Sequence, residues 1–269
     1  MLGKGGFSEV YKGFDTELLT EVAIKVHEFH ASWNASAKDN YIKHALRENS
    51  VQKMLSHPNI VQLHDTVEVD SSSFCTVLEY CEGPDLSYYL KKHRKIQEKE
   101  AKLIIRQVIN AIKYLHDLPD KVIHYDLKPQ NILFHKGRIK ITDFGLCKTT
   151  KEDRIELTSQ GVGTYWYLPP ECFVNDQKAI ITPKVDVWSI GVIYFEMLFG
   201  EKPFGHQMSQ VRILNEGIML KASEVKFPQT QKGLISNESR DFIRDCLKFH
   251  THERLDIRGV ASHRLFEKK

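Results

Sequence analysis

The sequence of 269 residues has few cysteines, no unbroken hydrophobic run and almost no net charge, and each absence excludes a class of protein. Its five cysteines are odd in number, scattered and without a Cys-x-x-Cys pair, which argues against a disulfide framework and against a zinc site. We therefore expect reduced, mostly buried thiols in an intracellular protein. The 38 basic and 35 acidic residues leave a net charge of +3, far from the basic excess of a nucleic-acid-binding protein, so we expect no direct nucleic-acid partner.

The longest apolar stretch, Val185–Phe199, is too short and too often interrupted to cross a membrane, and no membrane association is expected. Asp186, Ser189 and Glu196 break the stretch, which predicts a buried core helix. The N-terminus also lacks the apolar segment of a secretory signal. With 41% hydrophobic residues the chain has the composition of a globular protein, and its length suffices to bury a large core.

The first eighty residues have the pattern of a β-rich segment with one helix. Runs rich in Val, Ile, Tyr and Phe, separated by Gly, Asp and Ser, predict strands at Glu9–Phe14, Glu21–Glu28, Ile60–Val69 and Phe74–Tyr80. Between the second and third runs, apolar residues recur at helical spacing and predict a helix over Lys38–Leu55. The turn residues Ser56–Asn59 follow it.

After Glu82-Gly83-Pro84 the pattern becomes helical. Helices are predicted at Asp85–His93, Gln97–Leu118, Lys184–Gly200, Ser209–Lys221 and Asn237–Phe249. A short β-rich patch, Asn131–Phe134 and Arg138–Thr142, interrupts them. The sequence thus predicts a small β-rich half and a larger helical half that meet at a hinge near Glu79–Gly83, and the cleft between two such halves is where ligands usually bind.

The first candidate site is the glycine-rich run Gly3–Val10, in which glycines allow backbone amides to approach phosphate groups. The strand-like run Val22–Lys25 follows about twenty residues later and ends on a lysine that can reach the same phosphates. Glu48, on the predicted helix, is the candidate partner of the Lys25 ammonium. Taken singly, each feature has an ordinary alternative: a glycine turn, a charge on an exposed strand edge and a solvated helix residue.

The second candidate site is the proline-containing loop His124–Asn131, which lies between apolar runs. It places a carboxylate, an ammonium and an amide (Asp126, Lys128 and Asn131) within six residues, which suits a site better than a core. A further segment, Asp143–Gly145, puts a carboxylate at the end of an apolar strand, where its glycine permits a sharp turn. Two unrelated acidic loops are the alternative, and the combined spacing of all the segments argues against it.

In order and spacing, these segments resemble the signature motifs of the eukaryotic protein kinases. The matching segments are Gly3–Val10, Val22–Lys25, Glu48, His124–Asn131, Asp143–Gly145, Pro169–Glu171 and Asp186–Gly191. Three segments match more narrowly and resemble the tousled-like serine/threonine kinases: Phe74–Gly83, His124–Asp126 and Leu157–Val174. His252–Leu255 extends the resemblance almost to the C-terminus.

The resemblance implies an α+β, bilobal protein-kinase fold over residues 1–269. A small β-rich N-lobe with one key helix (1–80) would be joined by a hinge (79–83) to a larger, mainly helical C-lobe (84–269). Because the sequence begins at the glycine loop, we expect the first strand to be truncated at its start. The coiled-coil oligomerisation region and the nuclear-targeting region of the tousled-like family are expected to lie outside these residues.

The resemblance also implies ATP and Mg²⁺ as cofactors and gives roles to the candidate residues. Asp126 would orient the substrate hydroxyl and accept its proton, and Lys128 would neutralise the γ-phosphate. Lys25, paired with Glu48, would hold the α- and β-phosphates. The remaining ligands would be Asn131 and Asp143 for Mg²⁺; Leu2, Val10, Ala23 and Leu133 around adenine; the backbone of Glu79 and Cys81 at its edge; Leu78 at the back of the pocket; Asp85 at the ribose; and Gly3, Gly5 and Gly6 over the phosphates.

Two structural pairs and two departures complete the resemblance. Glu171 is expected to pair with Arg254, and Asp186 to brace the loop around His124. Ser8 replaces the third glycine of the glycine loop, which should cost some flexibility. Tyr125 replaces the arginine that in many kinases receives an activation-loop phosphate, so we expect basal activity without a phosphate bound there.

Three functions remain open from the sequence. An active serine/threonine kinase is favoured, because Lys25, Glu48, Asp126, Asn131 and Asp143 are all present. A pseudokinase that acts as an interaction scaffold is the alternative from a different class, and a small-molecule kinase of similar fold is a third. The tousled-like resemblance implies a nuclear location and protein substrates among histone chaperones and chromatin-assembly proteins.

Overall fold

The computed structural model describes residues 1–4, 8–17, 19–28, 34, 49–70, 73–156, 163–174, 180–229 and 234–267. The chain divides into two compact units. Unit 1 comprises Met1–Pro84 and Leu133–Gly145, and unit 2 comprises Asp85–Ile132 and Leu146–Lys269. The first unit is built on a sheet and the second on helices, which confirms the predicted α+β class.

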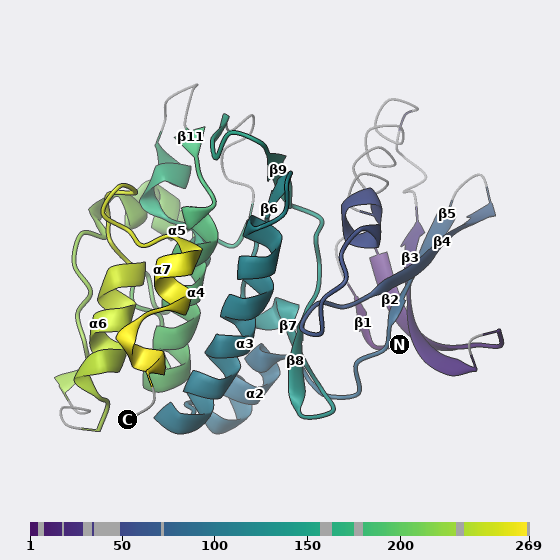
Figure 1. Ribbon diagram of the computed structural model, residues 1–269, viewed down its shortest axis with the longest axis horizontal. Coiled ribbons are helices and arrows are strands. Elements are labelled where there is room, and N and C mark those ends of the chain that lie inside the picture. Colours follow the sequence, from purple (N-terminus) through teal and green to yellow (C-terminus); the bar gives the residue numbers. More distant parts are fainter. Residues whose placement is uncertain are drawn as a thin grey trace. The chain divides into compact units, whose positions relative to one another are not determined.

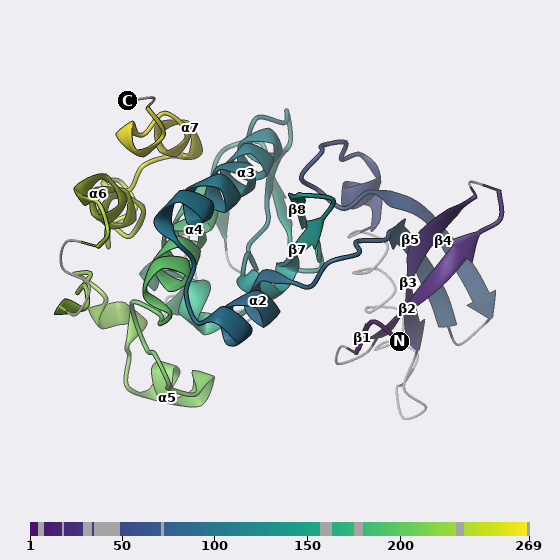
Figure 2. The ribbon, with the colours of Figure 1, turned by 90° about the horizontal axis from the view of Figure 1, so that it is seen from below.

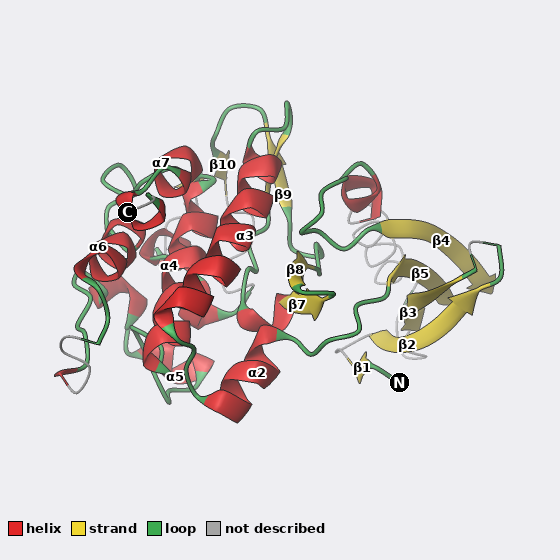
Figure 3. Cartoon of the chain, turned by 60° about the horizontal axis from the view of Figure 1, so that its bottom comes forward, coloured by secondary structure: helices red, strands yellow, loops and turns green. Residues whose placement is uncertain are grey.

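Unit 1 is organised around a five-stranded antiparallel sheet with the order β1-β2-β3-β5-β4 (Figure 3). Its strands are β1 (Gly3–Lys4), β2 (Ser8–Asp15), β3 (Thr20–Glu28), β4 (Leu63–Asp70) and β5 (Ser73–Glu79). Strand β5 alternates between buried and half-buried side chains along its whole length, so that one face of the strand supplies the core. The four strands predicted in this segment are confirmed, with ends shifted by up to three residues.

The predicted helix Lys38–Leu55 is described only at its end, where residues 49–53 are helical. Two buried amides attach this end to the sheet. The side-chain nitrogen of Asn49 lies 3.1 Å from the Thr66 hydroxyl and 3.3 Å from the Thr76 hydroxyl, and that of Gln52 donates to the Val61 carbonyl at 3.0 Å. The end of the helix is therefore fixed by specific hydrogen bonds as well as by apolar contact.

A hairpin of β7 (Ile132–His135) and β8 (Arg138–Ile141) returns the chain to unit 1. Its two turn residues, Lys136 and Gly137, both have positive φ (46° and 75°), as a tight two-residue hairpin requires. The hairpin is bonded to the rest of the unit, with Val61 N–H donating to the Ile141 carbonyl at 2.9 Å. The two strands of the predicted β-rich patch are thus confirmed, and nearly all of the hairpin belongs to the sheet-containing unit, although the sequence predicts the patch in the helical half.

Unit 2 is built around α4 (Lys184–Phe199), which is buried along nearly its whole length. Helix α3 (Glu98–His116) packs against α4 and α7 (Ile257–Ala261), and α4 also packs against α6 (Asn237–Cys246) (Figures 1 and 2). Helices α2 (Leu86–His93) and α5 (Gln210–Asn215) complete the unit. The prediction of a core helix at Val185–Phe199 is confirmed, since even its Asp186 and Ser189 are fully buried.

Local sequence signals explain most helix ends in unit 2. The Asp85 carboxylate accepts from Tyr88 N–H at 2.8 Å and caps α2, and Gly200 ends α4 with φ 74°. The prediction of one helix over Ser209–Lys221 is wrong, because Gly217 adopts φ 59° and separates α5 from a short 3₁₀ turn at Met219–Lys221.

A short helix and several short strands were not predicted from the sequence. These are α7 and the two-stranded pairs β6 (Lys121–Ile123) with β9 (Lys148–Thr150) and β10 (Ile155–Glu156) with β11 (Ile180–Ile181). Across the ranges that the structure describes, no helix combines the length and the hydropathy needed to span a bilayer. All five cysteines are free thiols.

Candidate active site

The apolar part of the candidate site is a cluster in unit 1. Its buried members are Ala23, Val61, Leu63 and Leu78, and Val10, Tyr80, Cys81 and Leu133 pack against them. Five residues predicted for the adenine pocket are therefore brought together, whereas Val61, Leu63 and Tyr80 were missed because only the folded sheet places them there. The predicted Leu2 is exposed, and its N–H donates to the Val10 carbonyl at 2.7 Å.

The segment from Glu79 to Gly83 is held by hydrogen bonds to the β7–β8 hairpin. The Glu79 carboxylate accepts from the Lys140 ammonium at 2.7 Å and from Gln62 N–H at 3.2 Å. His135 Nδ1 accepts from Glu82 N–H at 3.4 Å, and Gly83 N–H donates to the Phe134 carbonyl at 3.0 Å. Lys140 and His135 were not predicted, because their contacts with this segment depend on where the hairpin folds.

Cys81, in this same segment, has backbone groups that are available for hydrogen bonding and a thiol that stays protonated. Within the described ranges neither its N–H nor its carbonyl has a hydrogen-bond partner, so the edge of the apolar cluster offers one donor and one acceptor. Burial, followed by the negative charge of Glu79, raises the pKa of the Cys81 thiol to about 12. The side chain therefore contributes packing and no nucleophile.

The charged part of the site in unit 1 is the pair of Lys25 on β3 and Asp143 after β8. The Lys25 ammonium lies 3.8 Å from Asp143 Oδ1, and the Asp143 side chain is 46% exposed. Asp143 has φ 66°, a left-handed conformation that is uncommon outside glycine and typical of functional turns. The predicted partner Glu48 and the phosphate-loop residues Gly5 and Gly6 lie outside the described residues. Gly3 is described, and a Cβ at this position would meet no atom.

In unit 2, three side chains form a closed triangle of polar contacts: Asp126 and Lys128 from the loop His124–Asn131, and Thr164. The Lys128 ammonium lies 2.5 Å from Asp126 Oδ2 and 3.0 Å from the Thr164 hydroxyl, which in turn donates to Asp126 Oδ1 at 2.9 Å. Asn131 Nδ2 donates to the Asp126 carbonyl at 2.9 Å. Both oxygens of the largely buried Asp126 carboxylate are thus fixed in direction. Thr164 lies far from the loop in sequence, and the resemblance marked only the segment Leu157–Val174 that contains it.

Asp186 at the start of α4 holds the backbone of this loop. Its carboxylate accepts from His124 N–H and Tyr125 N–H, both at 2.9 Å, and its Oδ2 lies 2.9 Å from His116 Nε2. The carboxylate is fully buried, so these contacts replace the water that it would otherwise bind. The expected bracing of the loop by Asp186 is confirmed, and His116 is a further contributor that sequence reasoning missed.

Tyr125 occupies the position where the resemblance expects an arginine. It is buried with φ 68°, the Lys148 ammonium lies over its ring at 5.0 Å, and its phenol is close to the Cys172 side chain. Burial, followed by the proximity of Cys172, raises the pKa of the Tyr125 phenol, which keeps it neutral. An aromatic ring with a cation on its face therefore fills this position.

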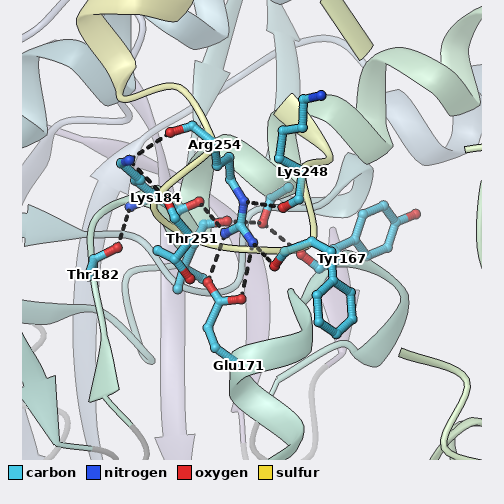
Figure 4. A network of polar contacts seen from close by, with 10 residues as sticks. Tyr167, Glu171, Thr182, Lys184, Lys248, Thr251 and Arg254 are labelled. Atoms are coloured by element: carbon cyan, nitrogen blue, oxygen red, sulfur yellow. Dashed lines mark hydrogen bonds and ion pairs between the residues drawn. The ribbon is translucent and has the colours of Figure 1, made fainter. Parts of the chain in front are cut away.

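A buried ion pair supports the segment that carries Thr164 (Figure 4). The Arg254 guanidinium forms two parallel hydrogen bonds to the Glu171 carboxylate, at 2.8 and 3.1 Å, and it also donates to the carbonyls of Lys248 and Lys184 at 3.1 Å each. The expected pairing of Glu171 with Arg254 is confirmed. Glu171 lies in the 3₁₀ turn Pro170–Phe173, which also carries Cys172, the neighbour of the Tyr125 phenol.

The two residues predicted as cation ligands, Asn131 in unit 2 and Asp143 in unit 1, each offer oxygen atoms. Asn131 Nδ2 is used on the Asp126 carbonyl, which leaves Asn131 Oδ1 without a hydrogen-bond partner among the described residues. Asp143 adds a carboxylate that is partly exposed. Mg²⁺ prefers such oxygen ligands, completed by water and phosphate oxygens, so the chemistry of both residues fits this ion. Asp85, predicted at the ribose, uses Oδ1 to cap α2 and keeps Oδ2 for other contacts.

A sheet unit with an apolar cluster and a lysine–aspartate pair, followed by a helical unit with an Asp-x-Lys-x-x-Asn loop, defines a protein kinase domain. The family model described as "Protein kinase domain" matches residues 1–266. Proteins of this family use ATP, typically with Mg²⁺, and act on protein substrates.

Comparison with curated proteins narrows the family further. The chain is 52% identical to serine/threonine-protein kinase tousled-like 2 of Xenopus tropicalis, over 97% of this chain and 39% of that protein. It is also 52% identical to human tousled-like 2, over 97% of this chain and 35% of the relative, and 50% identical to TOUSLED of Arabidopsis thaliana, over 97% and 38%. The chain belongs to the tousled-like family of serine/threonine-protein kinases. It spans less than two-fifths of the length of the curated relatives it matches.

Proposed function

We propose that the chain is an active kinase that transfers the γ-phosphate of ATP to serine and threonine hydroxyls of proteins. The observation that carries this proposal is the triangle of Asp126, Lys128 and Thr164. Phosphoryl transfer depends mainly on positioning and charge neutralisation, and the triangle supplies a directed carboxylate beside a cation. Asp126 would orient the substrate hydroxyl and take its proton, and Lys128 would turn to the γ-phosphate when ATP is bound.

Nucleotide binding would be the task of unit 1. The cluster around Ala23 and Leu78 would contact adenine, with the Cys81 N–H and the Glu79 carbonyl at its edge. Lys25 would hold the α- and β-phosphates and Asp143, together with Asn131, the cation. When bound, Mg²⁺ would neutralise charge on the phosphate oxygens. Support for this assignment comes from the oxygen donors of both residues and from the Lys25–Asp143 contact.

The test compares the wild type with Asp126→Ala and with Lys136→Ala, a matched change of an exposed side chain in a hairpin turn. Radiolabel from ATP should appear on a serine or threonine peptide and not on its tyrosine counterpart. Asp126→Ala should lose at least 99% of transfer, Lys136→Ala should keep it, and ATP·Mg²⁺ should raise the Tm of all three. Thermal stabilisation without transfer by the wild type would refute the proposal and favour an interaction scaffold.

We infer further that basal activity does not depend on a phosphate held at position 125. The Lys148 cation, which could otherwise meet a phosphate, is engaged on the Tyr125 ring. Single alanine substitutions at Thr149, Thr150, Thr158 and Ser159 should therefore each leave activity within a few-fold of the wild type. Loss of activity in every one of these variants would contradict this.

Membership of the tousled-like family also supports a proposal on cellular location and substrates. We propose a nuclear location and substrates among histone chaperones and chromatin-assembly proteins. Substrate phosphoproteomics in cells that express the wild type or Asp126→Ala would test it: phosphosites that depend on Asp126 should be enriched in such proteins. A set of sites confined to other compartments would overturn the assignment.

A further inference from the structure

Unit 2 contains a cavity of about 760 Å³ that does not include the catalytic loop. Its wall comes from the end of α3, the start of α4, the loop after α6 and the start of α7. Chemistry-bearing residues of the wall include Lys121, Asp153, Arg154, Lys184, His250 and Arg258. We propose that this cavity is a docking pocket for an acidic segment of a partner protein, held by carboxylate side chains on Arg154 and Lys184.

The carboxylates in the wall are already neutralised or used within the fold. Asp117 accepts from the Arg258 guanidinium at 2.8 and 3.1 Å, and it also pairs with Lys113. Asp153 pairs with Lys121 at 2.5 Å. Asp256 Oδ1 caps α7 by accepting from Gly259 N–H at 2.8 Å. The wall therefore repels an incoming anion less than three unpaired carboxylates would.

Two cations of the wall keep an unbalanced charge. The Lys184 ammonium donates to the carbonyls of Thr251 and Arg254, at 2.9 and 2.6 Å, and has no carboxylate partner in the described part of the chain (Figure 4). The exposed Arg154 guanidinium has no ion-pair partner among the described residues. Guanidinium groups bind carboxylates through two parallel hydrogen bonds, so Arg154 is the natural anchor and Lys184 adds positive charge.

The rest of the wall indicates that the ligand is a peptide rather than a simple anion. Ile180, which is 48% exposed, Pro183 and Ile257 give the cavity an apolar side. His250 and His252 stack with ring centroids 5.5 Å apart and offer flat, polar surface. A volume of this size holds several peptide residues. The partner segment should thus combine aspartate or glutamate with an aliphatic residue.

None of the residues proposed for catalysis or nucleotide binding lines the pocket, so its ligand would not use the groups that bind ATP. A substrate that carries an acidic segment would be retained near the enzyme, which raises its effective concentration at the catalytic loop. The expected kinetic sign is a lower KM for such a substrate with little change in kcat. This deepens the proposed kinase function, although binding to the pocket can be measured without any catalysis.

The direct test is fluorescence anisotropy of a labelled peptide that alternates glutamate and leucine, titrated with the whole chain. The wild type should bind it, and a peptide with lysine in place of glutamate should not. Arg154→Glu should weaken binding at least tenfold. Lys92→Glu, an equal charge change at an exposed position of α2, should weaken it less than twofold. No binding by the wild type, or equal binding by Arg154→Glu, would overturn the proposal.

A kinetic arm separates this proposal from the proposed kinase activity. Arg154→Glu should phosphorylate a short neutral serine peptide as the wild type does, and it should show a several-fold higher KM only when the acidic segment is joined to that peptide. If Arg154→Glu instead loses activity toward both peptides, the site acts on catalysis and the docking role is wrong. Tight binding of a phosphoserine peptide that has no aspartate or glutamate, with no binding of the glutamate peptide, would also refute the carboxylate assignment.

Discussion

Replacing Glu171 with glutamine is expected to destabilise the protein strongly, because the change leaves Arg254 charged, buried and without its counter-charge. The Arg254 side chain is among the largest that the structure buries fully, at 1% exposure, and two of its hydrogen bonds go to Glu171. Loss of one partner of a buried ion pair costs about 3–5 kcal/mol. Arg254 keeps carbonyl acceptors from Lys248 and Lys184, which places the expected cost near the lower end of that range.

The prediction can be measured by thermal and urea unfolding. For a chain of this size each kcal/mol lowers Tm by about 2–4 °C, so Glu171→Gln should lower Tm by about 6–12 °C. The control is Glu216→Gln, which breaks the pair with Arg212: that contact is equally short, at 2.6 Å, but its side chains are 59% and 44% exposed. The control should cost less than about 1 kcal/mol.

A double variant completes the test. The double variant, Arg254→Met with Glu171→Gln, removes both charges. Its loss of unfolding free energy should therefore be smaller than the sum of the losses in the two single variants. If Glu171→Gln costs no more than Glu216→Gln, burial does not control the strength of this pair and the reasoning fails. Additive effects of the two single changes would lead to the same conclusion.

Three further predictions follow from the site and its supports. Asp186→Asn should lower kcat at least tenfold, because the amide has only one oxygen and cannot accept from both the His124 and the Tyr125 N–H groups. An unchanged kcat would show that the loop keeps its conformation without these two hydrogen bonds. Lys140→Ala should raise the KM for ATP several-fold with kcat within twofold, because the Glu79 carboxylate loses its 2.7 Å anchor; a pure kcat effect would contradict this. Burial, and then the Lys25 ammonium, lower the pKa of His27 to about 4, so the unfolded chain binds a proton first as pH falls from about 6.5. Stability should therefore drop by about 2 kcal/mol between pH 7.5 and pH 5 through this residue, and the drop should shrink by that amount in His27→Gln; an identical pH profile in the variant would refute the assignment.

Periodic patterns predicted the parts of the fold that are long enough to display a period. Strand β5 and helix α3 are examples, because each buries one face and leaves the other more exposed. Strands β10 and β11 have two residues each and cannot show an alternation. The break at Gly217 was missed because a glycine inside an amphipathic pattern is compatible with both a helix and its end.

The candidate site was predictable where its residues are close in sequence and unpredictable where they meet only in the fold. Asp126, Lys128 and Asn131 lie in one loop, so local chemistry marked them. By contrast, His116 reaches Asp186 across seventy positions, and Lys140 reaches Glu79 across sixty-one. Such contacts depend on packing, and the residue pattern of a single sequence does not reveal them.

The discontinuity of unit 1 has a consequence for how the chain folds during synthesis. Its second segment, Leu133–Gly145, which contains most of the β7–β8 hairpin, is made after the first helices of unit 2. Until residue 145 has left the ribosome, Val61 N–H lacks its Ile141 acceptor and the Glu79 carboxylate lacks Lys140. During the synthesis of α2 and α3, the sheet of the nascent chain therefore lacks these hydrogen-bond partners of Val61 and Glu79. Unit 1 is thus completed only after residues 85–132 of unit 2 have been made, and a fragment cut after Pro84 should not fold to the native sheet.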